Sequence, residues 1–192
     1  IKETQKDMDI YIASAFFTEI DVIDELIKKN CHIRIIVRLG FPTSPSALRH
    51  LLRLKNIETR FYTSHEFHPK LYILDDKKIF VGSANLTKAA LLRNQEIMVG
   101  ILPDDLRFEE LTYLFSEYWK EAKVLTMEDI EKYEKVYKKY KDQLDAVNDF
   151  DDEVQKIIGE HKFSNIERYE AKQTQSELFV DSFLKTYQES VN

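Results

Sequence analysis

One stretch of the chain constrains its fold and its chemistry more than any other. It runs His68-Pro69-Lys70, four residues, Asp75, six residues and Gly82-Ser83-Ala84-Asn85. Two β-prone runs, 67–74 and 78–83, flank a charged segment suited to a tight turn, so the stretch predicts a β-hairpin. Side chains alternate faces along a strand, which puts His68 and Lys70 on one face. Closing the hairpin then brings both of them near Ser83 and Asn85, at its open end.

The side chains expected at this open end suit a phosphate group. A neutral imidazole such as that of His68 is a competent nucleophile or general base near neutral pH. The ammonium of Lys70, the hydroxyl of Ser83 and the amide of Asn85 can stabilise charge on non-bridging phosphate oxygens. A further strand, expected over 96–101, begins with Glu96. A carboxylate there would bond the second imidazole nitrogen and fix the tautomer, as the aspartate does in a Ser-His-Asp triad.

Three neighbouring features are expected to support this cluster. Asp75 falls on the strand face opposite His68, so its role is structural, in holding the turn. Gly82 lets the backbone come close to whatever binds there. The segment 87–93 has helical character, and its first turn is expected to aim free N–H groups at the same place.

Residues 68 to 85 resemble the HKD motif of the phospholipase D superfamily. The family motif is His-x-Lys, four residues, Asp, six residues, Gly-Ser/Gly, x, Asn, and this chain matches every fixed position. Glu96 stands where the family often carries an accessory acid. The strand–helix pattern from about 9 to 122 also fits one family domain, whereas the C-terminal part has no counterpart in the resemblance.

The resemblance implies a two-step phosphodiester hydrolysis that needs neither metal nor cofactor. His68 would attack phosphorus and form a phosphohistidine, while a second motif histidine protonates the leaving oxygen and then activates water. Lys70, Ser83 and Asn85 would hold the phosphate. The sequence has one such motif, so the resemblance implies a homodimer in which each copy contributes one histidine to a composite active site. A zinc site is not expected, because His65 and His68 lack the helical His-Glu-x-x-His spacing and a third ligand.

Three functions are compatible with this resemblance. The single-motif branch of the family includes endonucleases, metal-independent restriction enzymes and helicase-associated nuclease domains. The resemblance to this branch therefore implies that the domain hydrolyses DNA, or RNA, and is the nuclease part of a restriction or defence enzyme. A phospholipase or phosphatidyltransferase would use the same chemistry, but such enzymes usually carry two motifs in one chain, and no interfacial amphipathic basic helix is evident. A catalytically silent nucleic-acid-binding domain is the third alternative, against which the intact motif argues.

The rest of the sequence predicts an α/β fold, a phospholipase D-like mixed β-sheet flanked by helices, with a C-terminal helical extension. The pattern places a domain boundary between 1–125, the nuclease-like domain, and 126–192, a helical extension or subdomain. The expected strands are 9–16, 32–39, 58–62 and those of the motif region, and the expected helices are 19–29, 46–55, 105–121, 127–147, 153–160 and 175–189. An acidic break is expected at 148–152. The loop 39–46 should open on the active-site edge, because ligands gather at the C-terminal ends of strands in such sheets.

Composition and charge place further bounds on the chain. It has 192 residues, of which 43% are hydrophobic and 32% charged, as in an ordinary soluble globular protein. The net charge of −6 belongs to the segment 126–192, since 1–125 is balanced. A single cysteine, Cys31, and the lack of a signal peptide or apolar span indicate a cytoplasmic protein with no membrane contact. Ile1 is not an initiator methionine, which suggests a piece of a longer parent chain with further domains.

Two sets of side chains outside the motif leave two interpretations open. The cations Arg38, Arg49 and Arg53, just before the motif, either lie on solvated faces or line a path for a nucleic-acid backbone. The tyrosines 133, 137 and 140 follow helical spacing, which favours a packing face over a base-stacking platform.

Overall fold

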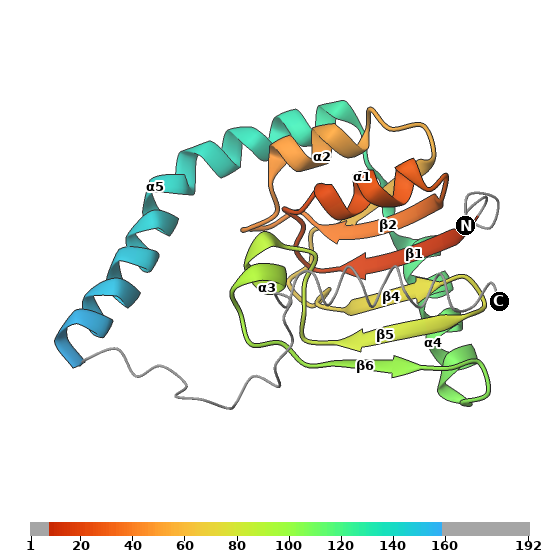
Figure 1. Ribbon diagram of the computed structural model, residues 1–192. Helices are drawn as coiled ribbons and strands as arrows, with labels where there is room; N and C mark the ends of the chain where they lie inside the picture. Colours follow the sequence, from red (N-terminus) through yellow and green to blue (C-terminus); the bar gives the residue numbers. More distant parts are fainter. Residues whose placement is uncertain (1–7, 159–192) are drawn as a thin grey trace.

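A mixed β-sheet forms the centre of the protein (Figure 1). The computed structural model describes residues 8–158. Its seven strands stand in the order β6-β5-β4-β1-β2-β3-β7. The strands are β1 Asp9–Ser14, β2 His32–Arg38, β3 Ile57–Tyr62, β4 Lys70–Leu74, β5 Lys78–Gly82, β6 Met98–Ile101 and β7 Lys123–Val124. The first three run parallel, and β4, β5, β6 and β7 each pair antiparallel with their neighbours.

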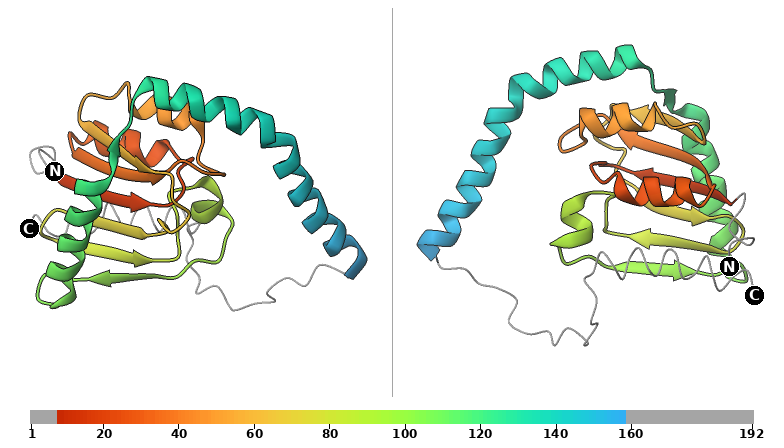
Figure 2. Two further views of the ribbon diagram at one scale, coloured as in Figure 1. Left: turned by 180° about the vertical axis from the view of Figure 1, so that it is seen from behind. Right: turned by 45° about the horizontal axis from the view of Figure 1, so that its top comes forward.

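Helices cover both faces of this sheet. They are α1 Asp21–Lys28, α2 Pro45–Leu51, α3 Lys88–Leu92, α4 Arg107–Glu121 and α5 Met127–Ile158. Helices α1 and α2 lie on one face, and the view from behind shows α4 crossing the other (Figure 2). This arrangement confirms the expected α/β fold with a mixed sheet, flanking helices and a C-terminal helix.

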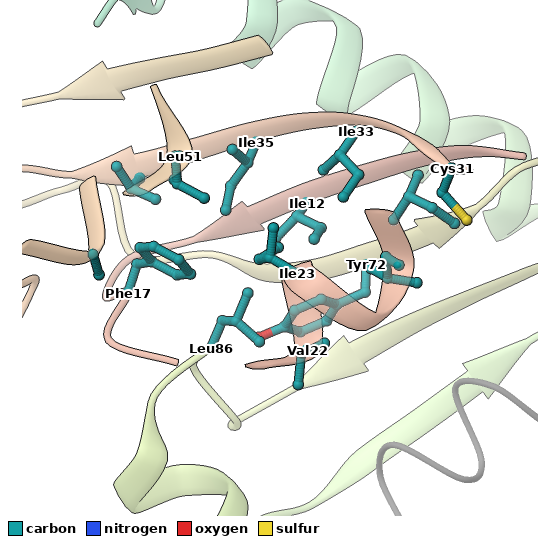
Figure 3. Close-up of a cluster of buried hydrophobic side chains, with 14 of the residues drawn as sticks. Ile12, Phe17, Val22, Ile23, Cys31, Ile33, Ile35, Leu51, Tyr72 and Leu86 are labelled. Carbon is teal, nitrogen blue, oxygen red and sulfur yellow. The ribbon is translucent and has the colours of Figure 1, made fainter. Parts of the chain in front are cut away.

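The central strands read as nearly continuous apolar runs because both of their faces are buried. On the α1 side, Ile12 of β1 and Ile33 and Ile35 of β2 pack against Val22 and Ile23 of α1 (Figure 3). On the other side, Ala13, Ile36 and Ile73 pack with aromatic residues of α4. Two hydrophobic layers therefore fix the position of β1 and β4. The end of β1 pairs with the start of β4, where Lys70 of the motif lies.

The motif hairpin forms, with one difference at its start. Strands β4 and β5 pair in the register Leu71 to Val81, and the turn lies at 75–77, as expected. However, β4 begins at Lys70 rather than at Phe67. Pro69 has no N–H to donate to a neighbouring strand, although its carbonyl still accepts from the Ala15 N–H at 3.0 Å. His68 therefore lies just before the strand, outside the β4 pairing, and its side chain is exposed.

The C-terminal helix is longer than the sequence indicated. The expected break at 148–152 is wrong, since α5 runs without interruption from Met127 to Ile158. This segment contains neither Pro nor Gly, and Asn and Asp disfavour a helix by less than about 0.7 kcal/mol per residue. The first turns of α5 pack on the domain, where Ile130 is fully buried and the Tyr133 hydroxyl donates to the Thr43 carbonyl at 2.8 Å. The helix expected at 175–189 lies outside the described residues.

Smaller differences concern the ends of elements and one short strand. Helix α2 ends at Leu51, four residues before the expected end, and β6 begins at Met98 rather than Glu96. The two-residue strand β7, which pairs with β3 at the sheet edge, was not anticipated, because two residues carry no periodic pattern. Within residues 8–158, no helix is both long enough and apolar enough to cross a bilayer.

Candidate active site

His68 and Lys70 form the centre of the site. His68 is exposed, whereas Lys70 is only 8% exposed. The Lys70 ammonium lies 2.6 Å from His68 Nδ1 and 3.2 Å from Nε2, and it donates to the His68 carbonyl at 2.9 Å. A buried cation is thus held directly against an accessible imidazole, and the two side chains lie together at the open end of the hairpin.

The electrostatic surroundings favour the neutral imidazole. Burial lowers the pKa of His68, and the nearby charges of Lys70 and Arg38 lower it further. The pKa of Lys70 is also lowered, first by burial and then by Arg38, while Glu96 opposes the change. Both shifts have the same two causes, burial first and the neighbouring positive charges second, and both causes disfavour the protonated form. A neutral imidazole is the form that can act as a nucleophile.

Arg38 belongs to this cluster although it comes from the end of β2. Its Nη1 donates to the His65 carbonyl at 2.9 Å, and its guanidinium lies 4.4 Å from the centre of the Phe16 ring. Phe16 in turn meets the His68 ring edge-on, with centroids 5.7 Å apart. Arg38 therefore lies next to the motif, at the start of the loop that was expected on the active-site edge.

Ser83, just after β5, and Glu96, just before β6, are joined by a hydrogen bond. The Ser83 hydroxyl donates to Glu96 Oε2, and it accepts from the Ile97 N–H at 2.9 Å. Asn94 donates to the other carboxylate oxygen of Glu96 at 3.2 Å. The hydrogen bonds of Glu96 within residues 8–158 thus go to Ser83 and Asn94, and the expected bond to His68 is absent there. In this arrangement Glu96 positions Ser83 rather than the imidazole.

Asn85 is held by the end of β1. Its Oδ1 accepts from the Phe16 N–H at 3.2 Å, which orients the amide and leaves its N–H2 group without a protein partner among the described residues. The buried hydroxyl of Ser14 donates to the Phe16 carbonyl and accepts from the Leu86 N–H at 2.9 Å. Ser14 is therefore a structural link between β1 and the motif loop, and Asn85 presents donors to the site.

The motif residues line one cleft of about 500 Å³. Its wall is completed by three residues of α4, namely Leu111, Leu114 and Tyr118. The sequence reasoning did not assign these three to the site, because helical periodicity predicts the helix but not which part of the sheet it covers. Leu114 is 38% exposed, and this exposure is visible only once α4 is placed over the sheet.

Two supporting features expected from the sequence differ in the structure. A Cβ at Gly82 would lie 2.0 Å from the Ile97 carbonyl oxygen, so this glycine, which also lines the cleft, allows β6 to approach. At the start of α3, two of the N–H groups already have acceptors within the protein. Lys88 donates to the Thr18 hydroxyl at 3.0 Å, and Ala90 donates to the Thr87 hydroxyl at 3.2 Å.

The other residues singled out from the sequence lie away from the cleft. Asp75 is in the turn at the far end of the hairpin, where it adopts a φ of 50° and donates its N–H to Asp9, in line with a structural role. Arg49 pairs with Glu134 at 2.6 Å and so ties α2 to α5. Arg53 follows α2, near the edge where β3 begins, which is opposite to the His68 edge. Arg49 and Arg53 are therefore not part of the cluster around His68.

No group of three or more His, Cys, Asp or Glu side chains placed to hold a metal ion occurs in residues 8–158. Cys31 is buried, and burial raises the pKa of its thiol to about 11. A thiol of this kind is a poor nucleophile near neutral pH. The cleft is lined by the imidazole, ammonium, hydroxyl and amide of the motif, together with Tyr118 of α4.

Comparison with known proteins relates these features to one family. The model of the family described as cardiolipin synthase, PLD-like domain, matches residues 1–119. Minor cardiolipin synthase ClsB from Bacillus subtilis (strain 168) is 38% identical over 74 residues, which are 38% of this chain. That match spans only 18% of the length of the curated relative.

Two solved structures share the fold. NucT from Helicobacter pylori has a TM-score of 0.54 at 17% identity, with 65% of this chain and 87% of NucT covered. Nuc from Salmonella typhimurium, a phospholipase D family member, has a TM-score of 0.52 at 22% identity, with 63% and 82% covered. Members of this superfamily are phosphodiesterases and phosphotransferases. The family match over most of the chain and the shared fold together establish that the chain belongs to the phospholipase D-like domain family.

Proposed function

We propose that this domain is a metal-independent phosphodiesterase that cleaves nucleic acid with His68 as its nucleophile. The observation that carries the proposal is the pairing of an exposed imidazole with a buried ammonium 2.6 Å away. Burial and neighbouring cations lower the pKa of His68, which keeps the imidazole neutral and nucleophilic. The same cations attract the phosphate on which it acts.

The proposed reaction has two steps that use two histidines. In the first, an imidazole nitrogen of His68 forms a bond to phosphorus while the bond to the leaving oxygen breaks, and a second histidine gives that oxygen a proton. In the second, the same histidine takes a proton from water, the water oxygen bonds to phosphorus, and the phosphorus–nitrogen bond breaks. Lys70, Ser83 and Asn85 would hold the non-bridging oxygens throughout.

The second histidine would come from another copy of the chain. Several apolar side chains on the surface that extends from the cleft to the far end of β6 are exposed to solvent, as expected for a surface that another subunit covers. They lie on β6, on α4 and on the connection between these elements, and are Ile97, Val99, Leu102, Leu106, Tyr113 and Leu114. Leu114 belongs both to this surface and to the cleft wall. In the proposed dimer, the second copy covers the part of this surface next to the cleft, at Ile97 and Leu114, so that His68 of the partner subunit faces the same phosphate.

Nucleic acid is proposed as the substrate because the site has cationic and aromatic surroundings. Arg38 and Phe16 adjoin His68, and phosphate backbones are bound chiefly by such cations. The second candidate is a phospholipase or phosphatidyltransferase. The family description and the 74-residue match to a cardiolipin synthase favour it. Both candidates share the phosphodiester chemistry, so the substrate must be decided by experiment.

The test is cleavage of plasmid and single-stranded DNA in excess EDTA by the wild type and by His68→Ala. We expect cleavage by the wild type and its loss in the variant, with thermal unfolding showing that both chains are folded. Cleavage that requires added metal and survives His68→Ala would contradict the proposal. Headgroup release from phospholipid vesicles without DNA cleavage would support the second candidate instead.

A further inference from the structure

A second cavity lies at the same edge of the sheet as the cleft, between α5 and the loop that follows β2. It has a volume of about 510 Å³. We call it the aromatic groove, and its lining residues that matter here are Leu39, Gly40, Phe41, Tyr133, Tyr137 and Tyr140. Lys123 and Lys132 also contribute to its lining. None of these residues has a part in the phosphodiester chemistry described above.

Aromatic rings form much of the wall of this groove. The rings of Phe41 and Tyr137 lie with centroids 5.8 Å apart and planes inclined by 31°. Phe41 is 39% exposed and Tyr140 is 41% exposed, whereas the Tyr133 hydroxyl is bonded to the Thr43 carbonyl. Tyr133 thus has the packing role that its spacing predicted. Phe41 and the adjoining, half-buried Tyr137 instead present ring surface to the groove, on which a flat ligand could stack.

Arg38 lies between the groove and the cleft. It is 92% buried, its Nε has no hydrogen-bond partner, and no carboxylate among residues 8–158 pairs with it. Burying a cation without an opposite charge is costly unless an anion binds it in the functional state. On one side its guanidinium contacts Phe16, next to His68. On the other, a Cβ added to Gly40 would lie 3.2 Å from Nε.

We propose that Arg38 and the aromatic groove form a subsite for the nucleotide that adjoins the scissile phosphate. Arg38 binds the neighbouring phosphate, and the base lies in the groove against the rings of Phe41 and Tyr137. This inference rests on the proposed function, since it assumes that His68 and Lys70 hold the scissile group. A base can enter the groove only when it is unpaired, so the preferred substrate is single-stranded nucleic acid.

The ring surfaces favour a base over a lipid tail. An acyl chain would pack equally well against leucine, because dispersion and apolar burial do not require a flat partner. Stacking with a base does require a ring, and each such contact contributes substantially to affinity for single strands. The Arg38 guanidinium, which has no carboxylate partner among residues 8–158, adds a binding site for the phosphate of the same nucleotide. Replacing an aromatic ring by leucine should therefore weaken the binding of a base but not the binding of an acyl chain.

The test measures binding of a fluorescent single-stranded oligonucleotide to the whole chain over a range of salt concentrations. Tyr137→Leu should weaken binding about tenfold, and Tyr137→Phe, which keeps the ring, should restore it. Phe41→Leu, on a different element, should act like Tyr137→Leu. Arg38→Gln should reduce the slope of log affinity against log salt by about one, as expected for one lost phosphate contact.

Three further measurements distinguish failure of this inference from failure of the proposed function. They use a small phosphodiester substrate, a duplex and phospholipid vesicles. Turnover of bis(p-nitrophenyl) phosphate by the wild type reports the phosphodiester chemistry without any need for the groove. A duplex of the same sequence should bind more weakly than the single strand. Unchanged oligonucleotide affinity in folded Tyr137→Leu and Phe41→Leu would overturn the inference. Binding to anionic phosphatidylglycerol vesicles with no single-strand binding would overturn it too, and would assign the groove to an acyl chain.

Discussion

The Lys70 ammonium lies 2.6 Å from Nδ1 of His68 and donates to the carbonyl oxygen of the same histidine. One side chain therefore fixes both the backbone and the ring of the proposed nucleophile. Burial is the largest cause of the lowered pKa of His68, followed by the charges of Lys70 and Arg38. Because the neutral ring is the nucleophile, lowering its pKa extends the active form toward acid pH.

Lys70→Met should raise the pKa of His68, because it removes one of the two positive charges that disfavour the imidazolium. The pKa should move toward 6.5, the ordinary histidine value, and the acid limb of any residual kcat/KM profile should move to higher pH. The measurement is an NMR titration of the His68 ring protons, which does not depend on activity. Lys77→Met, in the turn at the far end of the hairpin, is the matched control. An unchanged His68 pKa in Lys70→Met would contradict this role.

Glu96→Gln should lower turnover through Ser83 rather than through His68. The carboxylate accepts from the Ser83 hydroxyl and from the Asn94 amide, so it orients a proposed phosphate ligand. A glutamine keeps one acceptor but is neutral, and a misplaced hydroxyl should reduce kcat about 10- to 100-fold. We expect a smaller effect on substrate binding, because positioning acts mainly in the transition state.

The readout that separates this role from the expected bond to His68 is the NMR titration of the imidazole. Glu96 is not among the causes of the His68 pKa shift, so Glu96→Gln should leave that titration nearly unchanged. Ser83→Ala should reproduce the loss of turnover, and adding Glu96→Gln to it should cause little further loss. A large change in the His68 titration would show instead that Glu96 bonds the imidazole in solution.

The hairpin and its chemistry could be predicted from the sequence because they depend on local spacing. Four residues between Lys70 and Asp75, with a charged turn, determine which side chains meet at the open end, and the structure agrees. The family and the α/β fold followed from the same spacing and from the alternation of strands and helices. The turn position of Asp75 followed in the same way.

The errors concern relationships between elements that are distant in sequence. Gly82 was expected to let a ligand come close to the backbone. Its close neighbour in the structure is the backbone of Ile97, and this contact depends on how β6 packs beside β5. Glu96 was expected to form a hydrogen bond with His68, but the register of β5 and β6 places its carboxylate beside Ser83. Arg49 is paired with Glu134, 85 residues later, and no local pattern indicates that pair.

Gly82→Ala should destabilise the domain strongly. The added Cβ would lie 2.0 Å from the Ile97 carbonyl oxygen and 2.9 Å from the Met98 Cα, both backbone atoms that can move only if β6 separates from β5. We expect a loss of about 2–4 kcal/mol in the free energy of unfolding, which urea denaturation measures. Gly100→Ala is the matched control on β6, where the nearest atom is Cε of the flexible Lys78 side chain at 2.7 Å. That variant should lose less than about 1 kcal/mol, and equal losses would argue against a specific backbone contact at Gly82.

Mixing wild-type and His68→Ala chains should test whether the active site is composite. If each site needs His68 from both copies, a mixed dimer is inactive. An equimolar mixture that has exchanged subunits fully should then keep about one quarter of the wild-type activity, whereas independent subunits would keep about one half. The measurement is cleavage rate at a fixed total chain concentration, after dimer formation has been verified by light scattering.

Leu106→Glu provides the complementary change, because it disrupts the proposed interface without altering the cleft. Leu106 is 87% exposed, so a charge there costs the single chain little, but it would be buried unpaired between two copies. We expect a folded monomer with a normal thermal transition and little cleavage, because each cleft then holds one motif histidine instead of two. A fully active monomer would contradict the composite site, and it would mean that His68 needs no second motif histidine.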